Sequence, residues 1–511
     1  MNILDSFARH AQAHPKHLAL VSQDKVFSYG QLWATVGSVA LALQAHGVRR
    51  GERVAVSWMA PPAYLSVVLA LAWIGAVSTM ARDEKTMPGE RDRIMRRDGV
   101  TAWVLPAPGV EGAAALVGIR PIHVLDLFNR ASTPGALPQL AQGLADEPWR
   151  ITLSSGTTGE SKSIPWTHGQ LAALQRLQLD VYPSGPGERL LIFASLALGF
   201  SMVHATMQLA SGAALVLPLL SSTAAFFAAF DDTRPTRALT TTAVGFDLAA
   251  YARKTARNEP LRLSSLLLGG SVLPPNLRRE LEQRVCANLR VVYGSTEAGA
   301  MAHIDNQSYL ANPASAGRAM PWVRAEAVDE ADQPLPAGEI GRLRFHSPAM
   351  AGEYLGDPEA SARAFKSGWY YPGDLGSVDA HRKVFLAGRD DDVINVDGVK
   401  VNSAMVRQVL DADPSVIESA VSVVEQSDGR RLLVALVVPK ADVDAAHLQR
   451  LVEEKFGAVR APSRILSVEA LPRNPAGKVD RKALAVLAAA LLGRADSAPQ
   501  VPAAGNEGEA S

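Results

Sequence analysis

The first 150 residues alternate between two hydrophobic periodicities, one suited to helices and one suited to strands. Helix-length stretches, SFARHAQAH and YGQLWATVGSVALALQAHGV, are followed by short apolar runs such as RVAVSW and AWVLPA. Helices and strands that alternate at this spacing are typical of βαβ units, in which helices connect parallel strands. The pattern predicts an α/β fold whose large N-terminal domain has mostly parallel sheets flanked by helices.

Two long runs contain no Asp, Glu, Lys or Arg, and each could cross a bilayer by length alone. They cover residues 54–81 and 190–230. Pro, Gly and Ser interrupt both runs, so each divides into a helix and a strand: YLSVVLALAWI then GAVSTM, and MVHATMQLA then GAALVLPL. We therefore predict buried helices and strands here and no transmembrane segment.

Glycine-rich turns follow several of the predicted strands. SSLLLGGSVLPPNLRRELEQRV predicts a strand, a turn at Gly269, Gly270 and Ser271, and a helix opened by prolines, and LRVVYGSTEAGAM repeats the order of strand and glycine. WTHGQLAALQRLQLDVY predicts a helix directly after the loop at residues 154–162. Turns at the carboxyl ends of parallel strands meet at one edge of a sheet, the usual ligand side of α/β folds.

The character of the chain changes near Arg389 and Asp390. Short β-like pieces separated by Gly and Pro fill residues 325–346 and predict a β-rich subdomain, whereas a compact α+β pattern follows the change. We predict an N-terminal domain over residues 1–388 and a small, mobile C-terminal domain over residues 389–490. Residues 491–511, rich in Ala, Pro, Gly and Ser, predict a disordered tail.

Composition and charge narrow the function classes. The 511 residues are 48% hydrophobic and 20% charged, and 51 basic residues balance 51 acidic ones, so no electrostatic footprint for nucleic acid is present. Cys286 is the only cysteine, which excludes an intramolecular disulfide and a cysteine metal cluster. Asp5, Arg9 and Lys16 precede any long apolar run, so we expect no secretory signal and a cytoplasmic location.

The densest cluster of candidate chemistry is LSSGTTGESKSI at residues 153–164. Glycines permit close backbone approach, hydroxyls and free amides can surround an anion, and a lysine adds a positive charge. The stretch therefore predicts a phosphate-binding loop, although an ordinary polar turn would use the same residue types. Its members are Ser154, Ser155, Gly156, Thr157, Thr158, Gly159 and Lys162.

Four further motifs follow this loop in order. They are YGSTE at residues 293–297, GWYYPGD at 368–374, GRDDDVINVDG at 388–398 and PRNPAGKVDRKAL at 472–484. Together with the loop they resemble the adenylate-forming superfamily of acyl-CoA synthetases, nonribosomal-peptide adenylation domains and luciferases, over roughly residues 5–490. The resemblance implies ATP-dependent activation of a carboxylic acid, release of pyrophosphate, and transfer of the acyl group to a thiol.

The resemblance also implies roles for individual residues. The loop surrounds the β- and γ-phosphates of ATP, Thr296 contacts the α-phosphate, and Glu297 holds Mg²⁺, although a carboxylate at a helix N-terminus would be the structural alternative for Glu297. Asp374 and Arg389 bind the ribose. Tyr293 packs against adenine in the motif that also supplies Gly294 and Ser295. Gly269, Gly270 and Ser271 line the space between the nucleotide and the acyl group, and Phe200 belongs to the substrate pocket with Gly269 and Gly270.

Two C-terminal residues carry the largest implied roles. Lys478 would reach both the substrate carboxylate and the α-phosphate, adding positive charge where negative charge accumulates in the transition state. Asp390 matches the family's hinge, about which the C-terminal domain turns between adenylation and thioester formation. For Lys478 the structural alternative is one solvated lysine among several.

Some positions depart from the family pattern. Ser161 and Ser163 stand where the family usually has proline and glycine, and Met405 and Arg407 stand where acidic residues are usual. A proline common near the acyl pocket is replaced around Thr242.

The sequence gives partial information about the acid that is activated and the thiol that accepts the acyl group. LALGFSMVH lacks the aspartate that pairs with an amino-acid amine, so we expect an uncharged fatty or aromatic tail. The thiol would belong to coenzyme A or, alternatively, to the phosphopantetheine of an acyl carrier protein. From another class, GTTGESKS differs by one residue from the pattern GxxxxGK[ST] of P-loop kinases and ATPases, which would release ADP instead of AMP.

Overall fold

The computed structural model describes residues 1–23, 25–81, 89–106, 118–131, 136–154, 161–219, 222–389, 393–396, 399–425, 431–440, 442–474 and 478–497. The chain divides into two compact units. The first comprises residues 1–273, 277–390 and 475–478, and the second comprises residues 274–276, 391–474 and 479–511.

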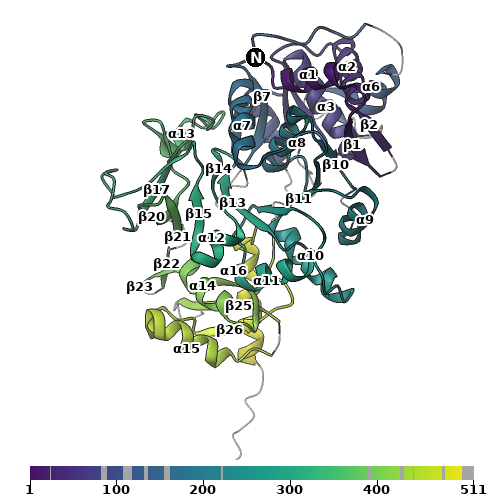
Figure 1. Ribbon diagram of the computed structural model, residues 1–511. Helices are drawn as coiled ribbons and strands as arrows, with labels where there is room; N and C mark the ends of the chain where they lie inside the picture. Colours follow the sequence, from purple (N-terminus) through teal and green to yellow (C-terminus); the bar gives the residue numbers. More distant parts are fainter. Residues whose placement is uncertain are drawn as a thin grey trace, which may run out of the picture. The chain divides into compact units, whose positions relative to one another are not determined.

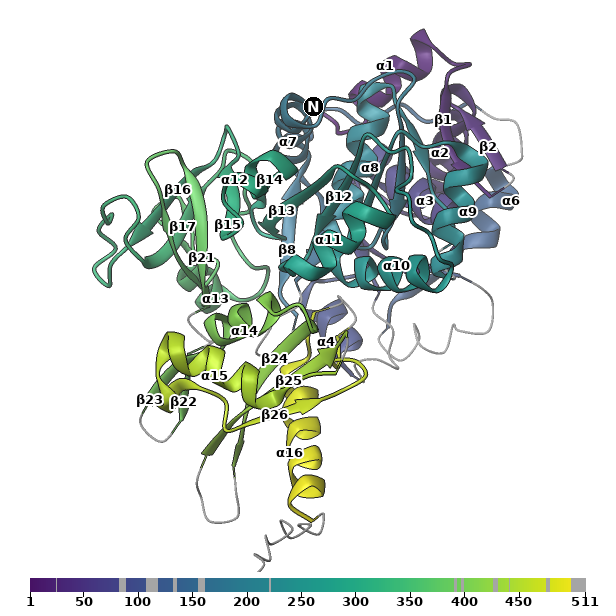
Figure 2. The same cartoon turned by 60° about the horizontal axis from the view of Figure 1, so that its bottom comes forward.

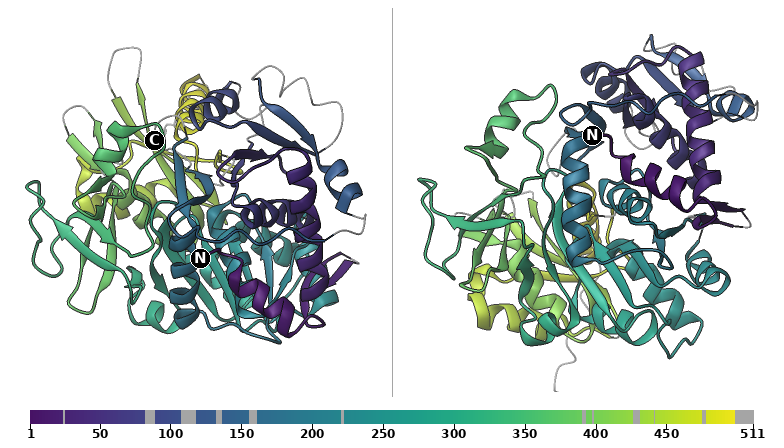
Figure 3. Two further views of the ribbon diagram at one scale, coloured as in Figure 1. Left: turned by 90° about the horizontal axis from the view of Figure 1, so that it is seen from above. Right: turned by 45° about the horizontal axis from the view of Figure 1, so that its top comes forward.

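A six-stranded sheet, counted among the described residues, lies in the N-terminal part of the first unit. Its order is β6-β5-β3-β4-β7-β8, and all neighbours are parallel except β7 and β8, which are antiparallel. The strands are β3 (Arg53–Val56), β4 (Val77–Met80), β5 (Ala102–Leu105), β6 (Arg120–His123), β7 (Pro148–Leu153) and β8 (Ser163–Thr167). Nearby helices are α1 (Asp5–Ala13), α2 (Tyr29–Ala45), α3 (Pro61–Ile74), α4 (Glu90–Arg97) and α6 (Val124–Ala131). The purple helices beside the N label in Figure 3 are α1 and α2, which pack together.

A larger sheet occupies the rest of this unit (Figure 1). Its parallel part runs β1-β10-β9-β11-β12-β13, and β2 (Lys25–Ser28) pairs antiparallel with β1. The parallel strands are β1 (Leu18–Ser22), β9 (Arg189–Phe193), β10 (Ala214–Val216), β11 (Arg237–Thr241), β12 (Ser265–Gly269) and β13 (Leu289–Ser295). The helices are α7 (His168–Val181), α8 (Gly199–Ser211), α9 (Thr223–Thr233), α10 (Thr242–Lys254) and α11 (Pro275–Arg284).

Helices cover both faces of these parallel strands (Figure 2). Leu266 and Leu268 of β12 belong to a buried cluster with residues of α9, α10 and α11, whereas Leu267 belongs to the cluster that contains α7 and α8. Side chains alternate between the two faces of a strand, so an all-apolar run such as SLLL is suited to a sheet buried on both sides. The predicted α/β fold with mostly parallel sheets is confirmed.

The β-rich part of the first unit is antiparallel. Beyond β13 the large sheet continues through β14, β15, β21, β20, β17, β19 and β18, and β16 pairs with β17. These elements are β14 (Gly299–Ile304), α12 (Asn306–Ala311), β15 (Ser315–Ala319), β16 (Arg324–Val328), β17 (Gly341–His346), α13 (Pro358–Ala364), β18 (Phe365–Lys366), β19 (Trp369–Tyr370), β20 (Asp374–Val378) and β21 (Lys383–Arg389).

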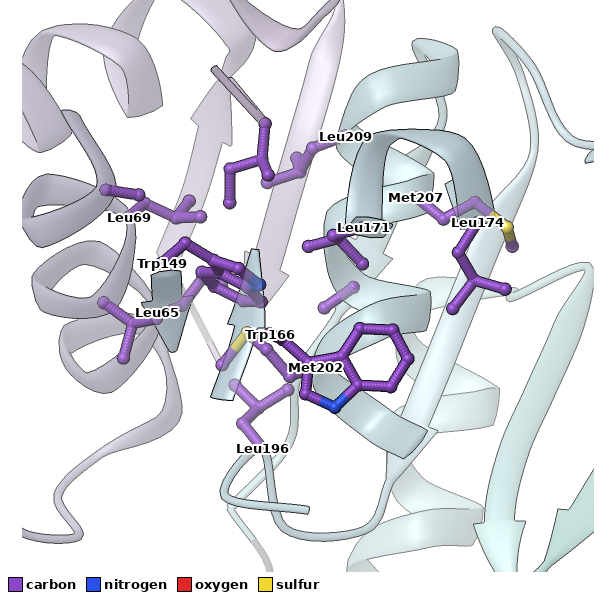
Figure 4. Close-up of a cluster of buried hydrophobic side chains, with 14 of the residues drawn as sticks. Leu65, Leu69, Trp149, Trp166, Leu171, Leu174, Leu196, Met202, Met207 and Leu209 are labelled. Carbon is purple, nitrogen blue, oxygen red and sulfur yellow. The ribbon is translucent and has the colours of Figure 1, made fainter. Parts of the chain in front are cut away.

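A continuous core joins the two sheets of the first unit. Figure 4 shows side chains of α3 on one side, side chains of α7 and α8 on the other, and Trp149 and Trp166 between them. From Tyr64 to Ile74, every residue of α3 is buried, which explains why this helix reads as a possible membrane span in sequence. No helix among the described residues combines the length and the apolar character that a membrane crossing requires.

The second unit is an α+β fold. Its strands are β22 (Val393–Val396), β23 (Val399–Asn402), β24 (Val416–Glu425), β25 (Arg431–Pro439) and β26 (Arg464–Ser467), and its helices are α14 (Ser403–Ala412), α15 (Ala445–Phe456), the 3-10 helix η2 (Ala458–Arg460) and α16 (Arg481–Ser497). β24 and β25 are antiparallel, and β26 pairs parallel with β25. One buried cluster includes residues of α14 and α15, and another includes residues of α16.

The end of the second unit differs from the sequence prediction. Helix α16 continues to Ser497, so the prediction of a disordered tail is wrong for residues 491–497. Leu492 is buried in a cluster with Leu484 and Ala488 of the same helix, and this burial favours continuation of the helix. The rest of the predicted tail lies outside the described residues.

The entry into α7 also differs. The predicted helix beginning at Trp166 is preceded by β8, and α7 begins at His168 with Thr167 as its N-cap. Ile164 and Trp166 suit a strand, and β8 pairs with β7 before the Thr167 and Gln170 side chains form a capping box. The prediction that the loop sits at a strand-to-helix junction is therefore wrong, because the loop connects two antiparallel strands.

Candidate active site

The candidate phosphate-binding loop connects the antiparallel strands β7 and β8. The backbone N–H of Ser154 donates to the carbonyl of Lys162 at 2.9 Å, which closes the hairpin across the base of the loop. Ser155, Gly156, Thr157, Thr158 and Gly159 lie outside the described residues. The Lys162 ammonium lies 4.5 Å from the centre of the Tyr354 ring, a cation–π contact that gives this side chain a defined direction.

Thr296 and Glu297 occupy the turn between β13 and β14. Trp166 of β8 donates its indole N–H to the carbonyl of Thr296 at 3.1 Å, and Tyr354 donates its hydroxyl to Glu297 Oε1 at 2.9 Å. Glu297 is only 7% exposed. The alternative that Glu297 caps a helix is wrong, because the structure brings it into a hairpin turn beside the Tyr354 that also contacts Lys162.

Asp374 lies at the start of β20 between two other predicted site residues. The Tyr293 hydroxyl from β13 donates to Asp374 Oδ2, and Arg389 Nη1 at the end of β21 lies 3.8 Å from Asp374 Oδ1. Arg389 also donates to the carbonyl of Pro372 at 3.2 Å. Burial, reinforced by the charge and hydrogen bond of Asp374, holds the pKa of Tyr293 well above its usual range, so its phenol keeps its proton and remains a donor.

Lys478 is grouped with the first unit, apart from its neighbours in sequence from Val479 onward. Burial lowers its pKa, as does the positive charge of Arg389, while the negative charges of Glu297 and Asp374 raise it. These opposing effects mean that Lys478 lies within electrostatic range of three predicted site residues from three different strands or turns. Asp390, the predicted hinge, lies outside the described residues.

The predicted acyl side begins at the N-terminus of α8. A Cβ built on Gly199 would lie 3.4 Å from Thr152 Cγ2 and 3.9 Å from Thr296 Cγ2, so this helix starts beside the ends of β7 and β13. One residue later, the Phe200 ring packs on Gly269, where a Cβ would lie 3.2 Å from the ring edge. A side chain at position 269 would displace this ring, so the close packing explains the glycine.

The turn after Gly269 is exposed and is hydrogen-bonded to the first residue of α10. Gly270 and Ser271 are exposed, and Gly270 has a φ of +100°, a conformation that favours glycine. Gly294 is also exposed, and Ser295 is half-buried. The buried hydroxyl of Thr242 donates to the carbonyl of Ser271 at 3.0 Å, an interaction that the proline usual in the family could not make.

Sequence reasoning missed a buried polar cluster beyond Phe200, formed by His204, Tyr182 and His303. The His204 ring lies 5.0 Å from that of Phe200 and 6.0 Å from that of Tyr182, and Tyr182 lies 5.9 Å from His303. His204 is 3% exposed, and neither of its ring nitrogens has a hydrogen-bond partner among the described residues. The Tyr182 hydroxyl and His303 Nδ1 likewise have none within that part of the chain.

Burial, together with the positive charge of Arg237, lowers the pKa of His204 to about 3. The imidazole is therefore neutral at physiological pH, with one nitrogen able to donate and the other able to accept. The signal in the sequence was a lone histidine four residues after Phe200, in the run MVHATMQLA that contains no Asp, Glu, Lys or Arg. Such spacing places both side chains on one helix face.

Comparisons with known proteins relate both units to one family. The model of the AMP-binding enzyme family matches residues 7–355, and the model of the AMP-binding enzyme C-terminal domain matches residues 406–478. A 3-hydroxybenzoate–CoA ligase from Aromatoleum sp. (strain CIB) is 26% identical over 499 residues, covering 92% of this chain and 93% of the relative. A fatty acid–[acyl-carrier-protein] ligase, ScoC, from Streptomyces coeruleorubidus is 26% identical over 498 residues, covering 93% of this chain and 94% of the relative.

A solved structure extends the comparison to the fold. The anthranilate CoA ligase AuaEII, in complex with anthranoyl-AMP, superposes with a TM-score of 0.86 at 21% sequence identity. The match covers 96% of this chain and 98% of that one. The resemblance drawn from the five sequence motifs is therefore confirmed at the level of family and fold.

Proposed function

The chain belongs to the AMP-binding enzyme family, and from this premise we propose that it is an AMP-forming acid–thiol ligase of the acyl-CoA synthetase type. It joins a carboxylic acid to ATP as an acyl adenylate, with release of pyrophosphate, and then transfers the acyl group to a thiol. One observation carries the proposal: two lysines 316 positions apart in sequence are both linked to Glu297. Lys162 contacts the ring of Tyr354, whose hydroxyl donates to Glu297, and Lys478 interacts electrostatically with Glu297 and Asp374. A kinase of the P-loop type would not need this arrangement.

The reaction determines what these residues must supply. A carboxylate attacks the α-phosphate and expels pyrophosphate, so negative charges approach one another and positive charge is needed more than an acid or a base. Lys162 suits the β- and γ-phosphates, since it follows the hydroxyl-rich loop. Lys478 suits the carboxylate and the α-phosphate, because it lies in the field of both Glu297 and Asp374.

The nucleoside would be held by the Asp374 carboxylate. Tyr293 and Arg389 approach different oxygens of this group, and a carboxylate has about four lone-pair positions that can accept hydrogen bonds, including those of ribose hydroxyls. Because the Tyr293 hydroxyl is committed to Asp374, its contribution to adenine binding would come from the ring. Gly294, Ser295 and the exposed Gly270 would line the same nucleoside-binding region.

Glu297 fits a magnesium ligand. It offers a buried carboxylate, the oxygen donor that Mg²⁺ prefers, and the Tyr354 hydroxyl fixes one of its oxygens. Bound there with ATP, Mg²⁺ would neutralise phosphate charge as the pyrophosphate leaves.

The acid is aromatic and carries a polar substituent. Its carboxylate would lie near Thr296 and Gly199, and its ring would pass Phe200. Its far end would approach His204, which lies four residues or about 6 Å further along α8. That spacing suits a benzoate-sized acid with a hydroxyl or amino group, and the 3-hydroxybenzoate and anthranilate specificities of the two relatives support this choice.

The acceptor is coenzyme A, with a carrier-protein phosphopantetheine as the second candidate, favoured by the similarity to an acyl-carrier-protein ligase. Asp390 remains the proposed hinge between the N-terminal domain and the C-terminal domain over residues 389–490. Met405 and Arg407 both lie on α14, where Arg407 pairs with Asp411 at 3.8 Å. We also propose a cytoplasmic location, consistent with the single, buried Cys286.

A substrate panel tests the proposal. Benzoate, hydroxybenzoates, aminobenzoates and fatty acids are each incubated with ATP and Mg²⁺, and pyrophosphate, AMP and ADP are measured with coenzyme A, with a phosphopantetheinylated carrier protein, or with neither. We expect pyrophosphate and AMP with substituted benzoates and a thioester with coenzyme A. Release of ADP would contradict the adenylation chemistry, and activity with fatty acids alone would contradict the aromatic substrate.

A further inference from the structure

The residues immediately before and after Lys162 are hydrogen-bonded to residues of helix α4 or its C-cap. None of the motifs includes this helix. The two neighbours of Lys162 are Ser161 and Ser163, which depart from the family pattern, and both are at most 3% exposed. Each makes hydrogen bonds to a charged residue at the beginning or end of α4.

Ser161 is bound to the first residue of α4. Its backbone N–H and its hydroxyl both donate to Glu90 Oε1, at 3.0 and 2.8 Å. Its carbonyl accepts from Arg97 Nη1 at 3.1 Å. Glu90 is 1% exposed, so these charge-assisted bonds form in a site from which water is excluded.

Ser163 is bound to the end of the same helix. Its hydroxyl donates to Asp98 Oδ2 at 2.6 Å and accepts from Arg97 Nη2. Arg97 Nε in turn donates to Asp98 Oδ1 at 3.1 Å, and Arg53 donates to the Asp98 carbonyl at 2.7 Å. The Asp98 side chain is fully buried, and within this cluster Arg97 supplies the opposite charge while Ser163 supplies a hydrogen bond.

These contacts continue from Lys162 to Glu297. The carbonyl of Ser163 accepts from the N–H of Leu355 at 2.8 Å, and the adjacent Tyr354 lies under the Lys162 ammonium and donates to Glu297. With the Ser154 bond to the Lys162 carbonyl, the backbone is fixed at residues 161, 162 and 163. A lysine side chain whose backbone is held in this way loses less freedom when it binds an anion.

We propose that Glu90, Arg97 and Asp98 form a positioning site that fixes Lys162 relative to Glu297, and thereby sets the affinity of the enzyme for the phosphates of ATP. Proline at position 161 would have neither the N–H nor the hydroxyl that Glu90 binds, and glycine at position 163 would lack the hydroxyl that Asp98 binds. The two serines thus replace intrinsic backbone restriction with hydrogen bonds to α4. The inference rests on the proposed phosphate role of Lys162.

The test compares Glu90→Ala with Glu90→Gln, in the full-length enzyme. Glu90→Ala removes the acceptor of two hydrogen bonds, and we expect the KM for MgATP to rise about tenfold while the KM for the acid stays within twofold. Glu90→Gln keeps an acceptor oxygen at the same place and should restore most of the affinity. Glu280→Ala is the matched control, because Glu280 on α11 is a mostly buried carboxylate that pairs with Arg253 on α10. Its loss should lower the stability of the fold without changing either KM.

Ser161→Ala and Lys162→Ala separate the possible failures. Ser161→Ala is a small change that should leave the protein folded and raise the KM for MgATP about threefold, which keeps the test decisive if Glu90→Ala does not fold. An unchanged KM in Ser161→Ala and Glu90→Ala, together with an increase in Lys162→Ala, would overturn the positioning role alone. An unchanged KM in Lys162→Ala would instead refute the phosphate role, and the positioning role with it.

Discussion

The two sides of the candidate site treat buried polar groups in opposite ways. On the phosphate side, formed by Glu90, Arg97, Asp98, Ser161 and Ser163, charged and hydroxyl groups are bound to one another. On the acyl side, formed by Phe200 and the polar cluster of Tyr182, His204 and His303, polar atoms are equally buried but lack hydrogen-bond partners among the described residues. Leaving a buried donor or acceptor unpaired costs about 1–3 kcal/mol, so this contrast has an energetic basis.

The difference follows from what each side must bind. The triphosphate is the same for every acid that the enzyme could activate. The polar groups on this side can therefore form hydrogen bonds with one another and keep Lys162 in a fixed position before ATP binds. The acid varies between enzymes. A buried imidazole such as that of His204, whose nitrogens have no hydrogen-bond partner in the described part of the chain, discriminates strongly in favour of a substrate that supplies the missing hydrogen bond. We infer that the phosphate side holds Lys162 rigidly, and that the acyl side determines which acid is selected.

The largest expected effect comes from Lys478, whose charge would serve both sides. Lys478→Ala should reduce pyrophosphate release from ATP and acid at least about 100-fold, because one charge that stabilises the transition state is lost. Thioester formation from a preformed acyl adenylate should continue. The exposed Lys482 provides the control, since Lys482→Ala should leave both half-reactions unchanged. Full adenylation by the Lys478 variant would remove this residue from the mechanism.

A smaller effect should isolate the acyl side. His204→Phe replaces a polar ring by an apolar one of similar size, and we expect kcat/KM for a hydroxybenzoate to fall about tenfold relative to that for benzoate. The KM for MgATP should not change. Thr206→Val on the same helix is the control for packing, because the Thr206 hydroxyl is bound to the backbone of α8 itself. Equal losses with both acids would show that His204 serves only the core.

The remaining predictions concern the stability of the fold, whose pH dependence should have opposite signs on the two sides. Burial raises the pKa of Asp98 in the folded state, so this carboxyl stabilises the fold at low pH and that contribution is lost as the pH rises through its pKa. Burial lowers the pKa of His204 from 6.5 to about 3, so its contribution is complete above pH 6.5 and is lost as the pH falls toward 3.

Urea unfolding of the two variants between pH 4 and pH 8 measures these signs. Relative to the unaltered protein, Asp98→Asn should gain stability as the pH rises, whereas His204→Phe should gain stability as the pH falls, by about 2 kcal/mol at pH 5. Parallel trends in the two variants would contradict the contrast between the two sides.

Much of the fold could be predicted from periodicity and turn residues. The apolar run of α3 is interrupted where β4 begins, and the SLLL run of β12 requires a sheet that is buried on both faces. The sequence could not decide whether residues 163–167 form a strand or the start of a helix. Their conformation depends on pairing with β7, a contact between segments whose local propensities are compatible with either state.

The sequence by itself determined the family, the chemistry and the residues of the motifs, because phosphate and ribose binding require particular side chains at particular spacings. Only the tertiary structure decided which residues support them. Glu90 and Asp98 lie 71 and 65 positions before the serines that they bind, and nothing in their local sequence distinguishes them from solvated charges on a helix. Burial against Ser161 and Ser163 gives them a role, since a hydrogen bond is set by distance in space and not by distance along the chain.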